Sequence, residues 1–220
     1  MVERENTLAS FLAAKENGVD GIEFDVRRTC DGALIVHHDS RCAGQAISET
    51  RQRDLPAYVP TLDDAMAACE GVTVNVEIKN SRKRSETTYD ETGALARQVV
   101  RHLQQIGWAD RVIISCFDQA TCAAVRSFDA EIALGWAVEK FDLVVALTQA
   151  HILGFTAVHP QFRGLSEEVM AMARELDLDI NTWTVNSKSG LTSVANLGVN
   201  GIITDDPRRA RAIIAEASLD

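Results

Sequence analysis

The sequence predicts an α/β fold, either a (β/α)8 barrel of the TIM type or a doubly wound parallel sheet. Three observations lead to this class. Short apolar runs alternate with segments of helical periodicity along the chain. No zone of different composition and no linker rich in proline or glycine interrupts the alternation, so we expect one domain over residues 1–220. The motifs GxGxxG and GxxxxGK[ST] are absent, which weighs against nucleotide-binding forms of the doubly wound sheet.

The first half of the chain shows the alternation most clearly. Residues 7–17 have helical spacing with Asn6 or Thr7 as the cap, and a strand is expected at 21–28. A helical stripe between 62 and 69 precedes a second strand at 72–79. A charged loop, residues 80–91, then leads into a helix that ends near residue 106.

The second half repeats the pattern, with a helix after each strand and a last helix from Pro207. Its expected strands are VIISCF, IALGWAV, FTAVHP, INTWTVN and GIITD. The expected parallel strands are thus those at about 22, 73, 112, 132, 156, 180 and 201. This is one strand fewer than a closed barrel has, so we expect a TIM-type barrel that lacks its first strand. The strand edges left exposed would favour a homo-oligomer.

The amino-acid composition limits the classes of molecule that this protein is expected to bind. The net charge of −10 argues against nucleic acid or an anionic membrane as the main partner, because both require clustered Lys and Arg. No apolar run approaches the roughly 18 residues of a membrane span. The five cysteines show no CxxC spacing, and no signal peptide is visible. We therefore expect a cytoplasmic protein with reduced thiols, and the net charge does not exclude a phosphate substrate.

A hairpin is predicted after the first strand. Asp31-Gly32 lies between two apolar runs and is typical of a two-residue type I′ turn. An antiparallel ladder centred on that turn places His38 opposite Asp25, with both side chains on the same face. A histidine would then lie one strand spacing from an acid.

Acidic side chains share one face of two neighbouring strands. Glu23 and Asp25 alternate with apolar residues in the first strand, and Glu77 does so in the second. Converging carboxylates repel one another, and a divalent cation removes that penalty. Oxygen ligands alone point to Mg²⁺ or Ca²⁺. The alternative is a structural ion network in which Glu23 and Asp25 pair with Arg27 and Lys79.

These residues also resemble a known family. The segments DGIEFDVRRTCDGALIVHHD, VPTLDDAM, NVEIK, IISCF, WTVN and GVNGIITDDP, in this order, look like the glycerophosphodiester phosphodiesterase family. The resemblance implies a (β/α)8 barrel that hydrolyses glycerophosphodiesters to an alcohol and glycerol 3-phosphate. It also implies a metal site formed by three acids: Glu23, Asp25 and Glu77. In this resemblance Lys79 faces the substrate phosphate, His38 is a general acid/base, and Trp183 lines the substrate pocket.

One part of the family pattern has no counterpart. The family opens with a strand that ends in His-Arg-Gly, whereas this chain starts with MVERENT. Two interpretations remain: a shortened version of a complete enzyme, or a truncated, non-catalytic relative that binds metal or phosphate. A phospholipase D-like activity on choline lipids is a third possibility, without support from export signals. His37 is expected to pack against a helix or solvent, and His159 either lines the pocket or is a plain loop residue.

Overall fold

A computed structural model describes residues 3–217 of the chain. The chain divides into two compact units, Met1–Ile132 and Ala133–Asp220. Both contain parallel strands that alternate with helices, as the sequence predicts. In the part of the chain that the structure describes, three parallel strands belong to the first unit and four to the second, which matches the seven expected.

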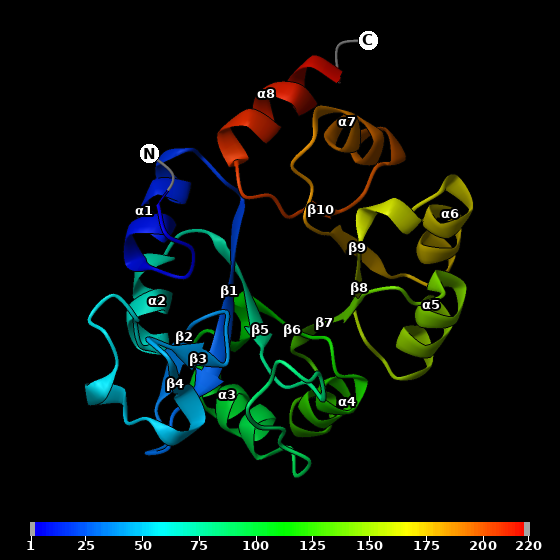
Figure 1. Cartoon of the computed structure of the whole chain (residues 1–220). Helices are drawn as coiled ribbons and strands as arrows, with labels where there is room; N and C mark the ends of the chain where they lie inside the picture. Colours follow the sequence, from blue (N-terminus) through cyan, green and yellow to red (C-terminus); the bar gives the residue numbers. More distant parts are fainter. Residues whose placement is uncertain (1–2, 218–220) are drawn as a thin grey trace. The chain divides into compact units, whose positions relative to one another are not determined.

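The first unit is built on a sheet with the strand order β6-β5-β1-β2. Strands β1 (Gly21–Arg28), β5 (Thr73–Ile78) and β6 (Val112–Cys116) are parallel, and β2 (Leu34–Val36) pairs antiparallel with β1. The helices are α1 (Leu8–Glu16), α2 (Leu62–Ala68), α3 (Ala94–Gln105) and α4 (Gln119–Phe128). Figure 1 shows α1 beside α2 and α3 beside α4, away from the line of strands.

Smaller elements complete this unit. A short hairpin joins β3 (Arg41–Cys42) to β4 (Gln45–Ala46). Three 3₁₀ turns follow: η1 (Ile47–Glu49), η2 (Gln52–Asp54) and η3 (Ala109–Arg111).

Side-chain alternation in β1 separates the core from the polar face. Ile22, Phe24 and Val26 are buried on one face, where Phe24 packs against Phe11 of α1 with ring centroids 5.5 Å apart. The apolar residues of β5 alternate in the same way. Because successive side chains of a strand point to opposite faces, the polar residues of β1 and β5 share the face away from these helices.

The second unit has the strand order β10-β9-β8-β7, and all its strand pairs are parallel. The strands are β7 (Ala133–Val138), β8 (Ala157–Pro160), β9 (Asp179–Thr182) and β10 (Gly201–Ile202). The helices are α5 (Leu143–Ile152), α6 (Glu167–Glu175), α7 (Lys188–Leu197) and α8 (Pro207–Ala217), and the 3₁₀ turn is η4 (Phe162–Gly164). No helix among residues 3–217 is long and apolar enough to cross a bilayer.

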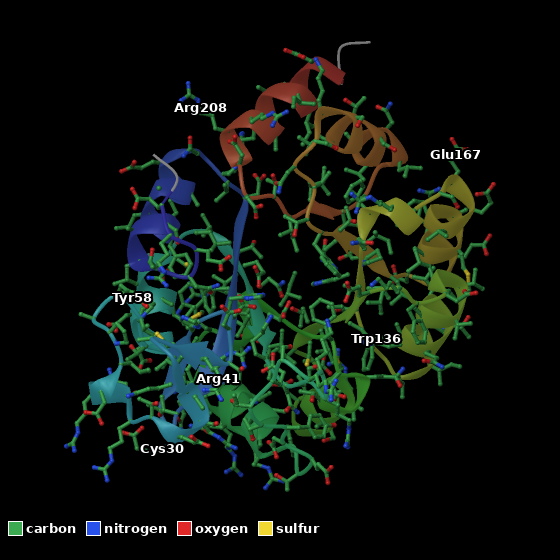
Figure 2. All side chains as sticks on the ribbon, in the orientation of Figure 1. Cys30, Arg41, Tyr58, Trp136, Glu167 and Arg208 are labelled. Atoms are coloured by element: carbon green, nitrogen blue, oxygen red, sulfur yellow. The ribbon has the colours of Figure 1, made fainter. Side chains whose placement is uncertain are left out.

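The β1–β2 turn differs from the predicted type. Its loop has three residues rather than two, because Thr29 N donates to Ala33 O and Gly32 N donates to Thr29 O. Gly32 adopts φ +84°, the left-handed conformation that closes such a loop. Cys30 lies in this turn and is exposed (Figure 2).

The longer turn shifts the strand register by one residue. Val26 is paired with Val36, and His37 N donates to Asp25 O over 2.9 Å. The prediction that His38 lies opposite Asp25 is therefore wrong by one position. The physical reason is that an extra loop residue moves every following residue back along the ladder.

Candidate functional site

Three carboxylates meet on the polar face of the first unit. In the parallel register of β1 and β5, Asp25 lies beside Glu77 and Glu23 lies beside Asn75. One oxygen from each of Glu23, Asp25 and Glu77 lies within 4.8 Å of the others. Asp25 is buried, and the other two acids are half-buried. The structure therefore brings together the three acids that the sequence predicts as metal ligands.

Lys79 supplies one positive charge to this cluster. Its Nζ lies 2.9 Å from Glu77 Oε1 and 3.2 Å from Asp25 Oδ1. The predicted alternative, a network with Lys79 and Arg27, is half realised, because Arg27 pairs elsewhere. Three carboxylates and one ammonium group leave two formal negative charges in a nearly dry space.

The pKa values of these groups reflect that excess of negative charge. Burial, and then repulsion by Asp25 and Glu77, hold the pKa of Glu23 well above its ordinary value. Burial also raises the pKa of Glu77, although the charge of Lys79 opposes the effect. Burial alone would lower the pKa of Lys79, but the charges of Glu77 and Asp25 outweigh it and raise that pKa.

The residues fit a divalent cation. All the charged donors are carboxylate oxygens, which hard cations such as Mg²⁺ and Ca²⁺ prefer. Two further buried polar atoms, Asn75 Oδ1 and Ser115 Oγ, have no hydrogen-bond partner among the described residues. Ser115 of β6 is in register with Glu77, and Asn75 is in register with Glu23. Unpaired buried polar atoms beside an acidic cluster are typical of a site that takes a polar ligand.

Asn6 is a site residue that sequence reasoning missed. We expected it only as a possible helix cap, but Thr7 caps α1. The Asn6 side chain instead donates from Nδ2 to Asp25 Oδ2 over 2.8 Å and accepts from Asp25 N at Oδ1 over 3.0 Å. Its φ of +56° turns the chain, a conformation that asparagine tolerates better than most residues. The first bond fixes the orientation of the Asp25 carboxylate, and the second attaches Asn6 to the backbone of the same residue.

His38 lies beside the acidic cluster at its exposed edge. Its side chain is 53% exposed, and Nδ1 is 2.9 Å from Asp39 Oδ1. The imidazole is near enough to Glu77 for its charge to lower the pKa of that acid. Because Nδ1 of His38 is bound to the Asp39 carboxylate, the other ring nitrogen, Nε2, is available to exchange a proton with a ligand. His37 is half-buried, with Nδ1 3.0 Å from Asp39 O.

Arg27 does not pair with the acids of its own strand. Its guanidinium is buried and binds Glu86 through two bonds, Nη1 to Oε2 at 2.7 Å and Nη2 to Oε1 at 3.1 Å. The same group donates to the backbone carbonyls of His37 and His38. No local pattern predicts this arrangement, because Glu86 lies in a loop 59 residues away.

Trp183 belongs to the second unit and follows β9. Its indole Nε1 donates to His159 O over 2.7 Å. His159 is a buried residue of β8, so the prediction of a plain loop residue is wrong. Its ring lies where a side chain at Gly135 would be, and Nε2 is 3.0 Å from Asn181 Nδ2. Burial lowers the pKa of His159 to about 4.

Comparison with known proteins finds similar sequences and structures over most of the chain. A glycerophosphodiester phosphodiesterase from Caldanaerobacter subterraneus subsp. tengcongensis is 26% identical over 92% of this chain and 89% of its own length. The crystal structure of a glycerophosphodiester phosphodiesterase from Parabacteroides distasonis matches with a TM-score of 0.83 at 21% identity, covering 97% of this chain and 91% of that one. An Oleispira antarctica phosphodiesterase, solved with its product sn-glycerol-3-phosphate, matches with a TM-score of 0.83 at 20% identity, covering 96% and 91%.

The structural likeness confirms the predicted fold class, a TIM-type α/β barrel. The class of protein is therefore a barrel hydrolase that acts on phosphodiesters. The sequence matches the glycerophosphoryl diester phosphodiesterase family over residues 2–46 and 42–209, and the chain belongs to that family.

Proposed function

We propose that this protein hydrolyses glycerophosphodiesters to an alcohol and glycerol 3-phosphate at a divalent metal site. The observation that carries the proposal is the cluster of Glu23, Asp25 and Glu77, with acidic oxygens within 4.8 Å of one another. The named activity of the curated relatives and the product bound to the Oleispira antarctica enzyme support the substrate class. We further propose one barrel domain over residues 1–220, in line with the extent of the family match.

In this proposal the three acids hold Mg²⁺ or Ca²⁺. When bound, such a cation neutralises phosphate charge and lowers the pKa of a coordinated hydroxyl. The excess of two formal negative charges in the cluster suits a divalent ion. Asn6 holds Asp25 through Oδ2 and the backbone N, whereas Oδ1 lies 3.2 Å from Lys79 Nζ.

Two further side chains would act on the substrate. Lys79 carries a full positive charge well above neutral pH and would bind a phosphate oxygen, where negative charge develops. His38, oriented by Asp39 at Nδ1, would give or take the proton of a substrate hydroxyl. A place for Trp183 in the substrate pocket stays a prediction from the family resemblance.

The experiment is a turnover assay of the 220-residue chain. Glycerophosphocholine and glycerophosphoethanolamine are supplied with Mg²⁺ or Ca²⁺, and release of glycerol 3-phosphate is measured. We expect about one turnover per second or more. Glu77→Ala should abolish both turnover and calorimetric metal binding, whereas Glu16→Ala, which removes an exposed acid of α1, should change neither.

The assay separates the remaining alternatives. Metal binding without turnover would favour a non-catalytic binding module, and release of choline from a choline lipid would favour the phospholipase D-like activity. Absence of both binding and turnover in the wild type would contradict the proposal. No disulfide joins the five cysteines in the described residues 3–217, and we propose a reducing compartment such as the cytoplasm. Gel filtration of the same preparation measures whether the chain forms a homo-oligomer.

A further inference from the structure

Arg27 contributes a buried side chain that the proposed chemistry does not use directly. Only 6% of the side chain is exposed, and its counter-ion Glu86 is 13% exposed. The guanidinium donates from Nε to His37 O over 3.2 Å and to His38 O over 3.0 Å. Nη2 donates to His38 O over 2.6 Å, while both Nη atoms bind Glu86. One group thus binds the backbone of the two histidines and a distant loop at once.

Stability alone explains this arrangement poorly. Removing both charges of an ion pair from water is costly, and apolar residues of similar size stabilise a fold as well or better. Arg27 also lies two residues beyond Asp25, on the face that carries the acidic cluster. The nearby carboxylates of Asp25 and Glu77 nevertheless pair with Lys79. Arg27 pairs instead with Glu86, 59 residues away.

Glu86 belongs to the loop between β5 and α3, which is attached to the same region by further contacts. Ser40 Oγ donates to Ser85 O over 2.8 Å. Ser48 Oγ lies 3.4 Å from Thr87 Oγ1. Each of these bonds joins the loop to residues that follow His38. The loop and the His38 segment are therefore connected at several points, and the Arg27–Glu86 pair is the one with full charges.

We propose that Arg27 is a positioning residue that fixes the backbone of His38 and attaches the 80–91 loop to it through Glu86. The proposal rests on the proposed function, in which His38 moves the proton. Arginine suits this role because its planar fork donates in several fixed directions, whereas a lysine ammonium is a single point charge. Lysine at position 27 keeps the charge but cannot bridge two carbonyls and a carboxylate.

The test uses the 220-residue chain and three variants. Arg27→Lys keeps the charge, Glu86→Gln keeps the shape, and the combination of Arg27→Glu with Glu86→Arg reverses the pair. The control is Arg111→Lys with Glu70→Gln, since Arg111 and Glu70 form an exposed pair at 3.0 Å. For each protein, kcat, KM and calorimetric metal affinity are measured. Mass spectrometry then follows the rate of trypsin cleavage after Arg82, Lys83 and Arg84, which lie in the loop.

We expect kcat to fall about 10- to 100-fold in Arg27→Lys and Glu86→Gln, because a shift of about 1 Å in an acid/base group has effects of that size. KM and metal affinity should stay within about twofold, and cleavage in the loop should become several-fold faster. The reversed pair should not recover kcat, because a carboxylate at position 27 cannot donate to the His37 and His38 carbonyls.

Three results overturn the inference. One is an unchanged kcat and cleavage rate in both single variants. Another is recovery of kcat by the reversed pair, which would make the pair a structural salt bridge only. The third is an equal loss in the Arg111 and Glu70 control. If the wild type shows no turnover, the proposed function fails, and the cleavage rates then decide whether Arg27 and Glu86 hold the loop.

Discussion

Replacing Glu23 by Gln should stabilise the metal-free protein and abolish its stabilisation by metal. Coulomb's law with an effective dielectric constant of about 20 gives about 3.5 kcal/mol for two like charges at the 4.8 Å that bounds this cluster. Glu23 meets such repulsion from both Asp25 and Glu77. Proton uptake relieves part of it, because each unit of a raised pKa corresponds to about 1.4 kcal/mol. We therefore expect a net gain of about 1–3 kcal/mol.

The gain in stability from Glu23→Gln should increase as pH rises. An acid with a raised pKa keeps its proton in the folded state after the unfolded chain has released it, near pH 4.5. The folded state then binds more protons, so the free energy of unfolding falls as pH rises above that value. Glu23→Gln removes this dependence. The gain should be small at pH 4.5 and full at pH 8.

The assay is thermal and urea unfolding in EDTA at both pH values, repeated with millimolar Ca²⁺ or Mg²⁺. For a chain of this length the gain corresponds to about 2–10 °C in Tm. Metal should raise the Tm of the wild type and of the control Glu16→Gln, but not that of Glu23→Gln. A loss of stability in metal-free Glu23→Gln at pH 8, or an undiminished metal effect, would refute the reasoning.

Three other substitutions test the contacts of Asp25, of Lys79 and of His159. Asn6→Ala removes two hydrogen bonds to Asp25, so we expect a loss of about 1–3 kcal/mol in urea unfolding and weaker metal binding by calorimetry. Lys79→Met breaks a buried ion pair and should cost the metal-free protein about 3–5 kcal/mol in the same unfolding assay and abolish turnover. Gly135→Ala would place Cβ 2.2 Å from His159 Nε2 and should cost about 3 kcal/mol, most of which His159→Ala should cancel in a double-mutant cycle. Burial lowers the pKa of His159 to about 4, so the contribution of His159 to wild-type stability should be lost as pH falls from 6.5 to 4, and the difference between wild type and His159→Ala measures it.

Local patterns predicted most of the fold and the acidic cluster. Alternation of polar and apolar residues assigned Glu23, Asp25 and Glu77 to one face, because side-chain direction in a strand follows directly from residue parity. The order of strands and helices likewise followed from periodicity and glycine stops. The hairpin was predicted, but its register was not, since Asp31-Gly32 suits both a two-residue and a three-residue loop.

Contacts between distant segments required the tertiary structure. Nothing in the charged run at 80–91 distinguishes Glu86 from its neighbours, and the Asn6 side chain meets Asp25 only because the chain turns at φ +56°. The sequence by itself determined which residues are polar on which face of each strand. Only the tertiary structure decided which of them meet, because partners depend on loop paths and on the exclusion of water, and neither is encoded in local spacing.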